Sequence, residues 1–412
     1  MRRLLNLALL VLLVSLAASA EETIKIGGIG PLSAPGTVVG GIAMKFAMEL
    51  AVQDVNNWGG VLGKPLELVF ADTEGLPERG AAMAERLITK DKVVAIVGEY
   101  HSSVGLAVAE VCHKYGIPVL FAETWADAIT ETGYMEVFRI APASSMVSIA
   151  WADWMKAVGV KRVVLIYETT DYGIGRMETE KQLLAERGIE VVATFGVEIG
   201  STDFTPILMR IKAMDPPPDV VSAASVTGET SYNLERQMVE MGIAPTPQTI
   251  GIANQVAIQP EFWESVPGGN YFVFNQVGLP PAKWNFITRH VARAYYEHFH
   301  TKPPSYVLES YDAVWIMADA IERAGTTDPK ALIEALERTD IVLSQGRYWF
   351  EYGSHNPLPE DVPKFMWHQW PNPATLIIQY FEPNQSWEEA AVLWPPSYQT
   401  HGVLYIVPGT KP

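Results

Sequence analysis

The sequence TIKIGGI at residues 23–29 decides the fold, because its apolar and β-branched residues predict a buried strand at the start of the folded chain. A loop rich in Gly, Pro and Ser follows at residues 30–41, and apolar residues at helical spacing then predict a helix at residues 42–57. The alternation continues with strands at residues 66–71, 93–97 and 117–121 and helices at residues 79–89 and 104–115. Alternating strands and helices with short connections predict a parallel sheet with helices on both faces.

A second round of strands and helices begins after residue 142. Strands are predicted at residues 162–167, 190–195, 219–223 and 248–251, and helices at residues 145–157, 173–187, 204–214 and 230–241. Two such rounds predict an α/β protein with two lobes. Three further helices, at residues 282–299, 306–324 and 329–337, have no strands of their own, so we expect them to cover one of the two sheets. Five tryptophans in the tail at residues 347–398 are expected in the core of the second lobe.

Composition excludes several classes of protein. The 412 residues carry 30 Lys and Arg against 47 Asp and Glu, a net charge of −17, and no basic cluster, so nucleic acid is not an expected partner. A hydrophobic content of 48% excludes a disordered chain. Cys112 is the single cysteine and is expected as a small buried residue, which leaves no disulfide or zinc framework. The eight histidines show no metal-ligand spacing and no catalytic motif is present, so we expect neither a metal, nor a cofactor, nor an enzyme.

The first twenty residues have the pattern of a signal peptide. Arg2 and Arg3 precede an apolar run at residues 4–17, and Ala18-Ser19-Ala20 supplies the small residues of a cleavage site. The run of 14 residues, at about 1.5 Å each, is too short to span a bilayer core of roughly 30 Å. The sequence therefore predicts export from the cytoplasm.

The candidate ligand site lies in the loops that follow the strands, because open α/β sheets bind ligands beyond the carboxyl ends of their strands. In two facing lobes these loops border a common cleft. A helix N-terminus with serines can bind a carboxylate, although serine is also a common N-cap, and a tryptophan here can either line the cleft or pack inside a lobe. The candidate ligand-binding residues are Tyr100, Ser102, Ser103, Glu123, Thr124, Trp125, Tyr172, Thr227 and Asn254.

Four blocks of sequence resemble the periplasmic substrate-binding proteins of the leucine/isoleucine/valine-binding type. They are IKIG…GPLS from residue 24, VQDVN…GGVLGKP from residue 52, VG…SS from residue 97 and DYGIG from residue 171. The resemblance spans about residues 23–350 and implies two Rossmann-like lobes joined by three hinge crossings, near residues 140–143, 273–276 and 344–348. Lobe 1 would comprise residues 21–141 and 275–345, and lobe 2 residues 142–274 and 346–412. It also implies a monomer in the periplasm that serves an inner-membrane ATP-binding-cassette (ABC) permease and its ATPase.

The resemblance also assigns roles to single residues. Ser102 looks like the serine that binds the ligand carboxylate, and Tyr172 like the aromatic residue that covers the ligand. The family's threonine anchor corresponds to Trp125, or to Thr124 after a shift of one residue. Where amino-acid-binding members place a carboxylate for the α-ammonium, this chain has Ala253-Asn254-Gln255, and Glu123 is the candidate substitute. The family's small disulfide is absent as well.

The sequence thus predicts the binding component of an uptake transporter, with a branched-chain or other hydrophobic amino acid, or a related small carboxylate, as ligand. The missing carboxylate, together with Trp125 and Tyr172, supports a second hypothesis: an aromatic or aliphatic acid or amide that lacks an α-ammonium. A periplasmic sensor that passes its closed state to a receptor is a further alternative. An exported hydrolase would need a nucleophile, a base and an orienting group, and the sequence shows no such set.

Overall fold

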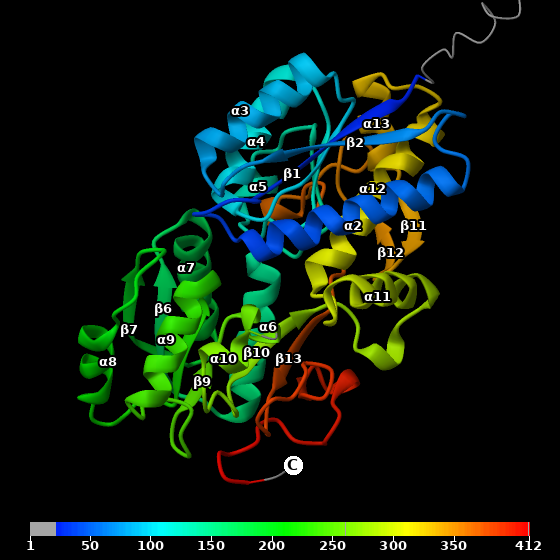
Figure 1. Ribbon diagram of the computed structural model, residues 1–412. Helices are drawn as coiled ribbons and strands as arrows, with labels where there is room; N and C mark the ends of the chain where they lie inside the picture. Colours follow the sequence, from blue (N-terminus) through cyan, green and yellow to red (C-terminus); the bar gives the residue numbers. More distant parts are fainter. Residues whose placement is uncertain (1–21, 260, 411) are drawn as a thin grey trace, which may run out of the picture.

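The protein consists of two lobes, each built around its own sheet, in the computed structural model, which describes residues 22–259, 261–410 and 412 (Figure 1). The predicted signal segment at residues 1–20 lies outside the described residues. In the part of the chain that is described, no helix combines the length and the apolar character needed to cross a membrane.

The first lobe contains a five-stranded sheet with the order β2-β1-β3-β4-β5, and all neighbouring strands are parallel. The predicted strand at residues 23–29 corresponds to β1, whose residues are nearly all buried because helices cover both faces of the sheet. Its strands are β1 (Ile24–Gly30), β2 (Leu66–Asp72), β3 (Ile96–Gly98), β4 (Val119–Phe121) and β5 (Val137–Arg139).

Helices from two distant parts of the chain cover the first sheet. The local helices are α2 (Val38–Asn57), α3 (Pro77–Arg86), α4 (Ser102–Tyr115) and α5 (Ala128–Glu131). The later helices α11 (Phe286–Phe299), α12 (Ser305–Ala324) and α13 (Pro329–Glu337) return to this lobe, where α12 packs along α2. Their apolar residues join those of α2 and β1 in one core, which confirms that these helices cover an existing sheet. Cys112 is fully buried on α4, as predicted.

The second lobe contains a seven-stranded sheet with the order β14-β13-β10-β9-β8-β6-β7. Five of its strands are parallel, and the two strands of the tail join them antiparallel at one edge. The strands are β6 (Arg162–Glu168), β7 (Glu190–Val197), β8 (Val220–Ser225), β9 (Ile250–Ile252), β10 (Val273–Val277), β13 (Thr375–Gln379) and β14 (Ala391–Trp394). The helices are α6 (Ser144–Val158), α7 (Asp171–Glu186), α8 (Thr205–Lys212), α9 (Gly228–Glu240) and α10 (Phe262–Ser265). The predicted two-lobed α/β class is confirmed.

The third crossing between the lobes differs from the predicted division at residue 345. The small hairpin of β11 (Asp340–Leu343) and β12 (Gly346–Trp349) leads into residues that stay in the first lobe, where Tyr348, Phe350 and Trp370 are buried in its core. The chain enters the second lobe only at β13, after Trp370. Residues 275–277 also lie in the second sheet, because β10 pairs with β9 and β13.

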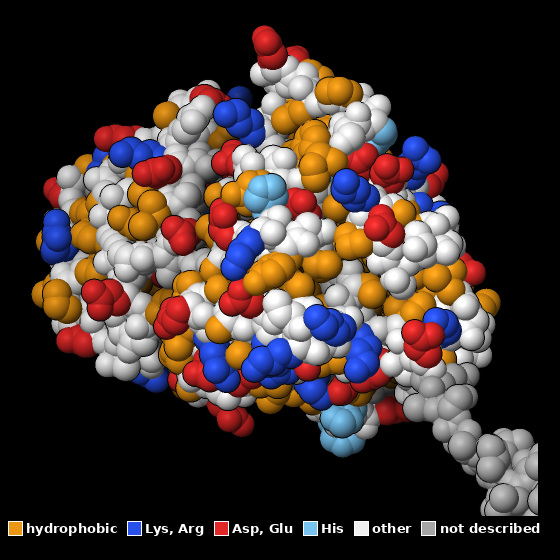
Figure 2. All heavy atoms as spheres, turned by 90° about the horizontal axis from the view of Figure 1, so that it is seen from above, with side chains coloured by type: hydrophobic (Ala, Val, Ile, Leu, Met, Phe, Trp, Pro, Cys, Tyr) orange, Lys and Arg blue, Asp and Glu red, His pale blue; other side chains and the backbone are white. Residues whose placement is uncertain are grey.

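The tail tryptophans accordingly divide between the lobes. Trp387 and Trp394 pack in the second lobe, as predicted. Trp349 and Trp370 belong to the first core, and Trp367 stacks on His368 in the same lobe. The expectation that all five lie in the second core is therefore wrong, since residues 346–370 complete the first lobe. On the face shown in Figure 2, Lys and Arg side chains lie among Asp and Glu, so that face presents no continuous basic surface.

Candidate functional site

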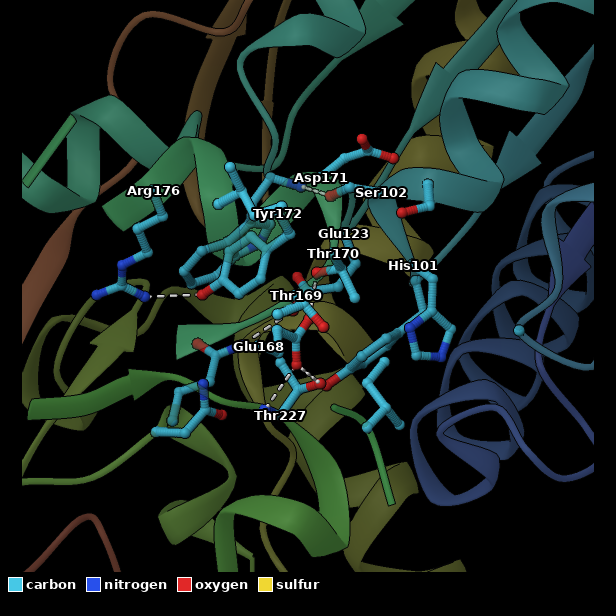
Figure 3. A pocket seen from close by; sticks show the side chains of 18 of the residues that line it. His101, Ser102, Glu123, Glu168, Thr169, Thr170, Asp171, Tyr172, Arg176 and Thr227 are labelled. Atoms are coloured by element: carbon cyan, nitrogen blue, oxygen red, sulfur yellow. Dashed lines mark hydrogen bonds between the residues drawn. The ribbon is translucent and has the colours of Figure 1, made fainter. Parts of the chain in front are cut away.

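A cavity of about 440 Å³ lies between the lobes, at the carboxyl ends of strands from both sheets (Figure 3). Loops after β3 and β4 form its wall in the first lobe, and loops after β6, β8 and β9 form the facing wall. Eight of the nine predicted residues line it: Tyr100, Ser102, Ser103, Glu123, Trp125, Tyr172, Thr227 and Asn254.

Thr124 is the exception among the predicted residues. Its side chain is fully buried, packs toward Gly105 of α4 and is absent from the lining of the cavity. The loop turns so that its neighbours Glu123 and Trp125 line the cavity while Thr124 faces the lobe interior. Of the two alignments considered for the anchor position, the structure thus brings Trp125 and not Thr124 to the cavity.

Ser102 presents a hydroxyl donor to the cavity. Its Oγ accepts the backbone N–H groups of Trp125 and Ala126, each at 3.0 Å. These two bonds use the acceptor sites of the hydroxyl, which leaves its proton to donate to a group in the cavity. The N-cap of α4 is His101 and not Ser102, so the reading of Ser102 as a mere helix cap is wrong. A hydroxyl donor at the first residue of a helix suits a carboxylate.

Trp125 serves both of the purposes considered for it. Its ring lines the cavity and also packs into an apolar cluster with Val147 and Trp151 of α6 in the second lobe. Its carbonyl oxygen accepts hydrogen bonds from the backbone and the hydroxyl of Ser144. The indole is thus fixed between the lobes, close to the crossing from β5 to α6.

Glu123 is a buried acid that contacts both lobes. Gln255 of the facing loop donates Nε2–H to Glu123 Oε1 at 2.9 Å across the cavity. On the other side, Glu123 interacts with Glu309 of α12. Burial raises the pKa of Glu123 to about 8, although the hydrogen bond from Gln255 opposes the shift. Burial and the neighbouring Glu123 raise the pKa of Glu309 as well.

Glu168 is a second buried acid, which the sequence analysis did not select. It ends β6, and its Oε2 accepts both the backbone N–H of Thr227 at 3.0 Å and the Thr227 hydroxyl at 2.7 Å. Its Oε1 accepts the Thr170 hydroxyl at 2.7 Å (Figure 3). Burial still raises the pKa of Glu168. The sequence did contain a signal for Glu168, because this glutamate ends a buried strand and begins a loop that was expected at the cleft.

Tyr172 covers part of the cavity from the start of α7 and is held by a buried cation. Arg176 donates to the Tyr172 hydroxyl at 2.7 Å, to Glu180 at 2.7 Å and to the carbonyl of Ala224 at 3.1 Å. The guanidinium is 1% exposed, so its charge is balanced by Glu180 inside the lobe. The sequence could have predicted this pair, because Tyr172 and Arg176 are four residues apart at the start of a predicted helix and therefore lie on the same face.

Three carboxamides, those of Asn254, Gln255 and Asn275, form another part of the facing wall. Asn254 accepts from Val256 N–H and donates to Ala224, so its amide caps the turn at residues 255–258. Gln255 Oε1 and Asn275 Nδ2, which also line the cavity, are buried without a hydrogen-bond partner among the described residues. No group of three His, Cys, Asp or Glu side chains in the described part of the chain is arranged to hold a metal ion.

Comparisons with known proteins agree with this geometry. The family model described as "Periplasmic binding protein" matches residues 23–356. An "Amino acid binding protein" of Pseudomonas aeruginosa is 26% identical over 354 residues, which cover 84% of this chain and 92% of that protein. A "Leucine-, isoleucine-, valine-, threonine-, and alanine-binding protein" of the same organism is 26% identical, over 81% of this chain and 87% of its own length.

Solved structures show the same fold. The branched-chain amino acid substrate-binding protein LivJ from Streptococcus pneumoniae, in complex with isoleucine, has a TM-score of 0.75 at 22% identity and covers 91% of this chain and 100% of its own. A solute-binding protein from R. palustris, in complex with benzoate, has a TM-score of 0.72 at 19% identity, over 90% of this chain and 96% of its own. Both kinds of ligand therefore occur on this architecture.

Proposed function

Because the chain belongs to the periplasmic binding protein family, we propose that it captures a small carboxylate-bearing solute between its lobes and delivers it to an ABC uptake transporter. The observation that carries the proposal is the cavity itself, which takes its lining from both lobes and offers the Ser102 hydroxyl at a helix N-terminus. In this assignment Ser102 and Ser103 hold the carboxylate, and Tyr172 and Thr227 close over the ligand from the second lobe.

Closure of the lobes is the mechanism we propose. Among the hydrogen bonds that join the lobes, two lie away from the crossing between β5 and α6: Gln255 donates to Glu123, and Gln259 donates to the hydroxyl of Tyr306 at 2.7 Å. Neither bond can form when the lobes are apart. A ligand that contacts both walls stabilises the closed arrangement by its differential affinity for it. The permease and its ATPase would then recognise the closed, ligand-bound form in preference to the open form.

For the ligand, we propose a branched-chain or other hydrophobic amino acid, in line with the names of the relatives. A specific observation favours a second candidate, an acid or amide without an α-ammonium. Residues 253–255 offer no carboxylate to the cavity, and the amide of Asn254 is occupied by its own lobe. We further propose that residues 1–20 are cleaved and that the mature protein acts as a periplasmic monomer.

A thermal-shift screen tests the proposed function. The mature protein is unfolded and refolded to remove any bound solute, and then screened against leucine, isoleucine, valine and phenylalanine and against the matching acids and amides without the amino group. A ligand at about 100 times its dissociation constant should stabilise the protein by about 2.7 kcal/mol. A panel in which no compound shifts the melting temperature would contradict the proposal.

A further inference from the structure

Helix α6 of the second lobe begins directly after the crossing from β5, and its first turn donates hydrogen bonds to the first lobe. Ala143 stands at its N-cap position and has no side chain that can accept a hydrogen bond. The backbone N–H of Ser144 donates to the carbonyl oxygen of Trp125 at 2.7 Å, and that of Ser145 donates to Asp127 Oδ1 at 3.1 Å. Because the first N–H groups of a helix need acceptors from outside it, the first lobe supplies the cap of a helix of the second.

Asp127 directs both of its carboxylate oxygens at this helix. Its Oδ2 accepts the hydroxyl of Ser145, the same residue whose backbone N–H donates to Oδ1. Asp127 also stands at the N-cap position of the short helix α5, but its side chain makes no capping bond there. A carboxylate at a helix N-terminus is stabilised by the helix dipole as well as by the hydrogen bonds. The side chain therefore caps a helix of the facing lobe in place of its own.

The segment at residues 125–127 is bonded at the same time to the proposed ligand site. The backbone N–H groups of Trp125 and Ala126 donate to Ser102 Oγ, and the carbonyl oxygen of Trp125 accepts from the N–H and the hydroxyl of Ser144. A Ser102 hydroxyl that donates to a carboxylate becomes a stronger acceptor for these N–H groups, because hydrogen bonds in a chain polarise one another. One short segment thus connects the carboxylate site to the start of α6.

Asp127 itself lies outside the ligand cavity. It is absent from the lining of that cavity and borders instead a second cavity of about 340 Å³, which lies between residues of α5 and α7. Glu131 of α5 and Glu178 of α7 border the second cavity as well. The bonds from Asp127 to Ser145 therefore form a separate contact between the lobes, next to the crossing and beside open space. An effect of Asp127 on affinity must accordingly act through the arrangement of the lobes.

We propose that Asp127 is a positioning residue for lobe closure: its carboxylate caps α6 in the closed arrangement and releases the helix when the lobes separate. The proposal rests on the proposed function, in which Ser102 holds the carboxylate of the ligand. A ligand that fixes the segment at residues 125–127 favours the closed, capped arrangement. By reciprocity, the capped arrangement binds the ligand more tightly than the uncapped one. Asp127 thus raises the affinity of a site that it does not touch.

Calorimetry with the compound found in the thermal-shift screen tests this inference on the refolded mature protein. Asp127→Ala removes both acceptors and should weaken binding by about tenfold. Asp127→Asn keeps an oxygen for the N–H of Ser145 and should restore most of the affinity. Glu131→Ala is the matched control, because it removes an acid of the same second cavity that has no hydrogen bond to α6 among the described residues, and it should leave the affinity unchanged. Equal affinities of the wild type and Asp127→Ala would overturn the inference.

Urea denaturation of the ligand-free protein separates a closure-dependent cap from a purely structural one. Without ligand the open arrangement, which lacks the cap, predominates, so Asp127→Ala should leave the unfolding midpoint nearly unchanged. A cap that persists in both arrangements would behave in the opposite way: the variant would lose stability and keep the dissociation constant of the wild type. That pair of results would overturn the inference and leave the proposed function intact.

A measurement of closure without ligand keeps the two proposals apart. If no compound of the screen binds, the proposed function is wrong, and single-molecule energy transfer between dyes on the two lobes still tests Asp127. The dyes are attached at Lys90→Cys and Lys181→Cys, which replace exposed residues of the first and second lobe, while Cys112 is fully buried. The ratio of closed to open molecules should fall about tenfold in Asp127→Ala. An equal ratio in the wild type and the variant would overturn the inference.

Discussion

Two buried polar clusters, one at the crossing out of β5 and one between the lobes, differ in how completely their polar atoms are hydrogen-bonded. In the hinge cluster, formed by Arg139, Thr130 and Gln369, the guanidinium donates to Gln369, to Thr130 and to the carbonyls of Thr124 and Ala126. Gln369 in turn donates to the carbonyls of Ala141 and Trp370. In the cleft cluster, formed by Glu123, Glu309, Gln255 and Asn275, polar atoms of every member lack partners among the described residues.

The difference distinguishes structure from binding. The hinge cluster joins β5 to the returning segment before β13 and contributes no residue to the cavity lining. A buried network in which every polar atom is hydrogen-bonded stabilises a single arrangement of the chain. Its contribution to the free energy of unfolding is measured by removing one member. In the cleft cluster Glu123, Gln255 and Asn275 line the cavity and keep donors and acceptors open, which costs stability in the absence of a ligand. Stability should therefore respond to substitutions in the first cluster, and affinity to substitutions in the second.

The largest effect is expected from Arg139→Met. The substitution leaves Gln369, Thr130 and two carbonyls without their donor in a buried site, so we expect a loss of about 3–5 kcal/mol in the free energy of unfolding. Urea denaturation of the mature protein measures it. Arg293→Met is the matched control: this exposed arginine pairs with Glu297 at the surface, where water screens the pair, and should leave stability nearly unchanged. Equal stabilities of the two variants would remove the distinction between the clusters.

The sequence indicated the scaffold of both clusters but not their members. Strand and helix periodicity predicted the longer elements through residue 337 in their order, and the loops after the strands predicted eight lining residues. Strand β5 was not predicted, because Glu136 and Arg139 leave only two consecutive apolar residues between them, too few for a strand signal. Glu309 lies within a helix that is buried on nearly all sides, where a glutamate has no local signal of function. Its contact with Glu123 is set by tertiary packing of α12 on the first sheet, which no local pattern encodes.

A substitution in the cleft cluster, Glu123→Gln, should raise the free energy of unfolding, whereas Arg139→Met should lower it. The pKa of Glu123 is raised from an ordinary value of 4.5 to about 8 in the folded state, so the folded protein must keep a proton that the unfolded chain releases. Stability from this group is complete below about pH 4.5 and declines until about pH 8. Glu123→Gln removes this decline and should stabilise the ligand-free protein by on the order of 2 kcal/mol at alkaline pH, with little effect in acid.

Urea denaturation at several pH values checks this result, and the acidic measurement serves as the internal control. A variant that is less stable than the wild type at alkaline pH would mean that Glu123 stabilises the fold as an ordinary structural acid. The cleft cluster would then behave like the hinge cluster.

Ser102 combines features of both clusters, since its acceptor sites are occupied and its donor is open. Ser102→Ala should weaken binding of the carboxylate ligand found in the screen by about tenfold, equivalent to about 1.4 kcal/mol. Ser103→Ala, which alters another residue of the lining, is the control and should weaken binding less. Calorimetry measures both, and equal losses would assign the carboxylate to the helix backbone and not to the Ser102 hydroxyl.

The smallest effect is expected at Thr124, which lies in sequence between two lining residues but belongs to neither cluster. Its hydroxyl is buried without a partner among the described residues, and its methyl group faces α4. Thr124→Val keeps the shape and removes an unsatisfied polar atom, so stability should stay within about 0.5 kcal/mol or rise slightly, with unchanged affinity. A tenfold loss of affinity, with stability preserved, would show that the loop after β4 turns Thr124 toward the ligand when the lobes close. Thr124 would then be the threonine anchor that the resemblance suggested. The ligand would in that case also contact a residue outside the cleft cluster.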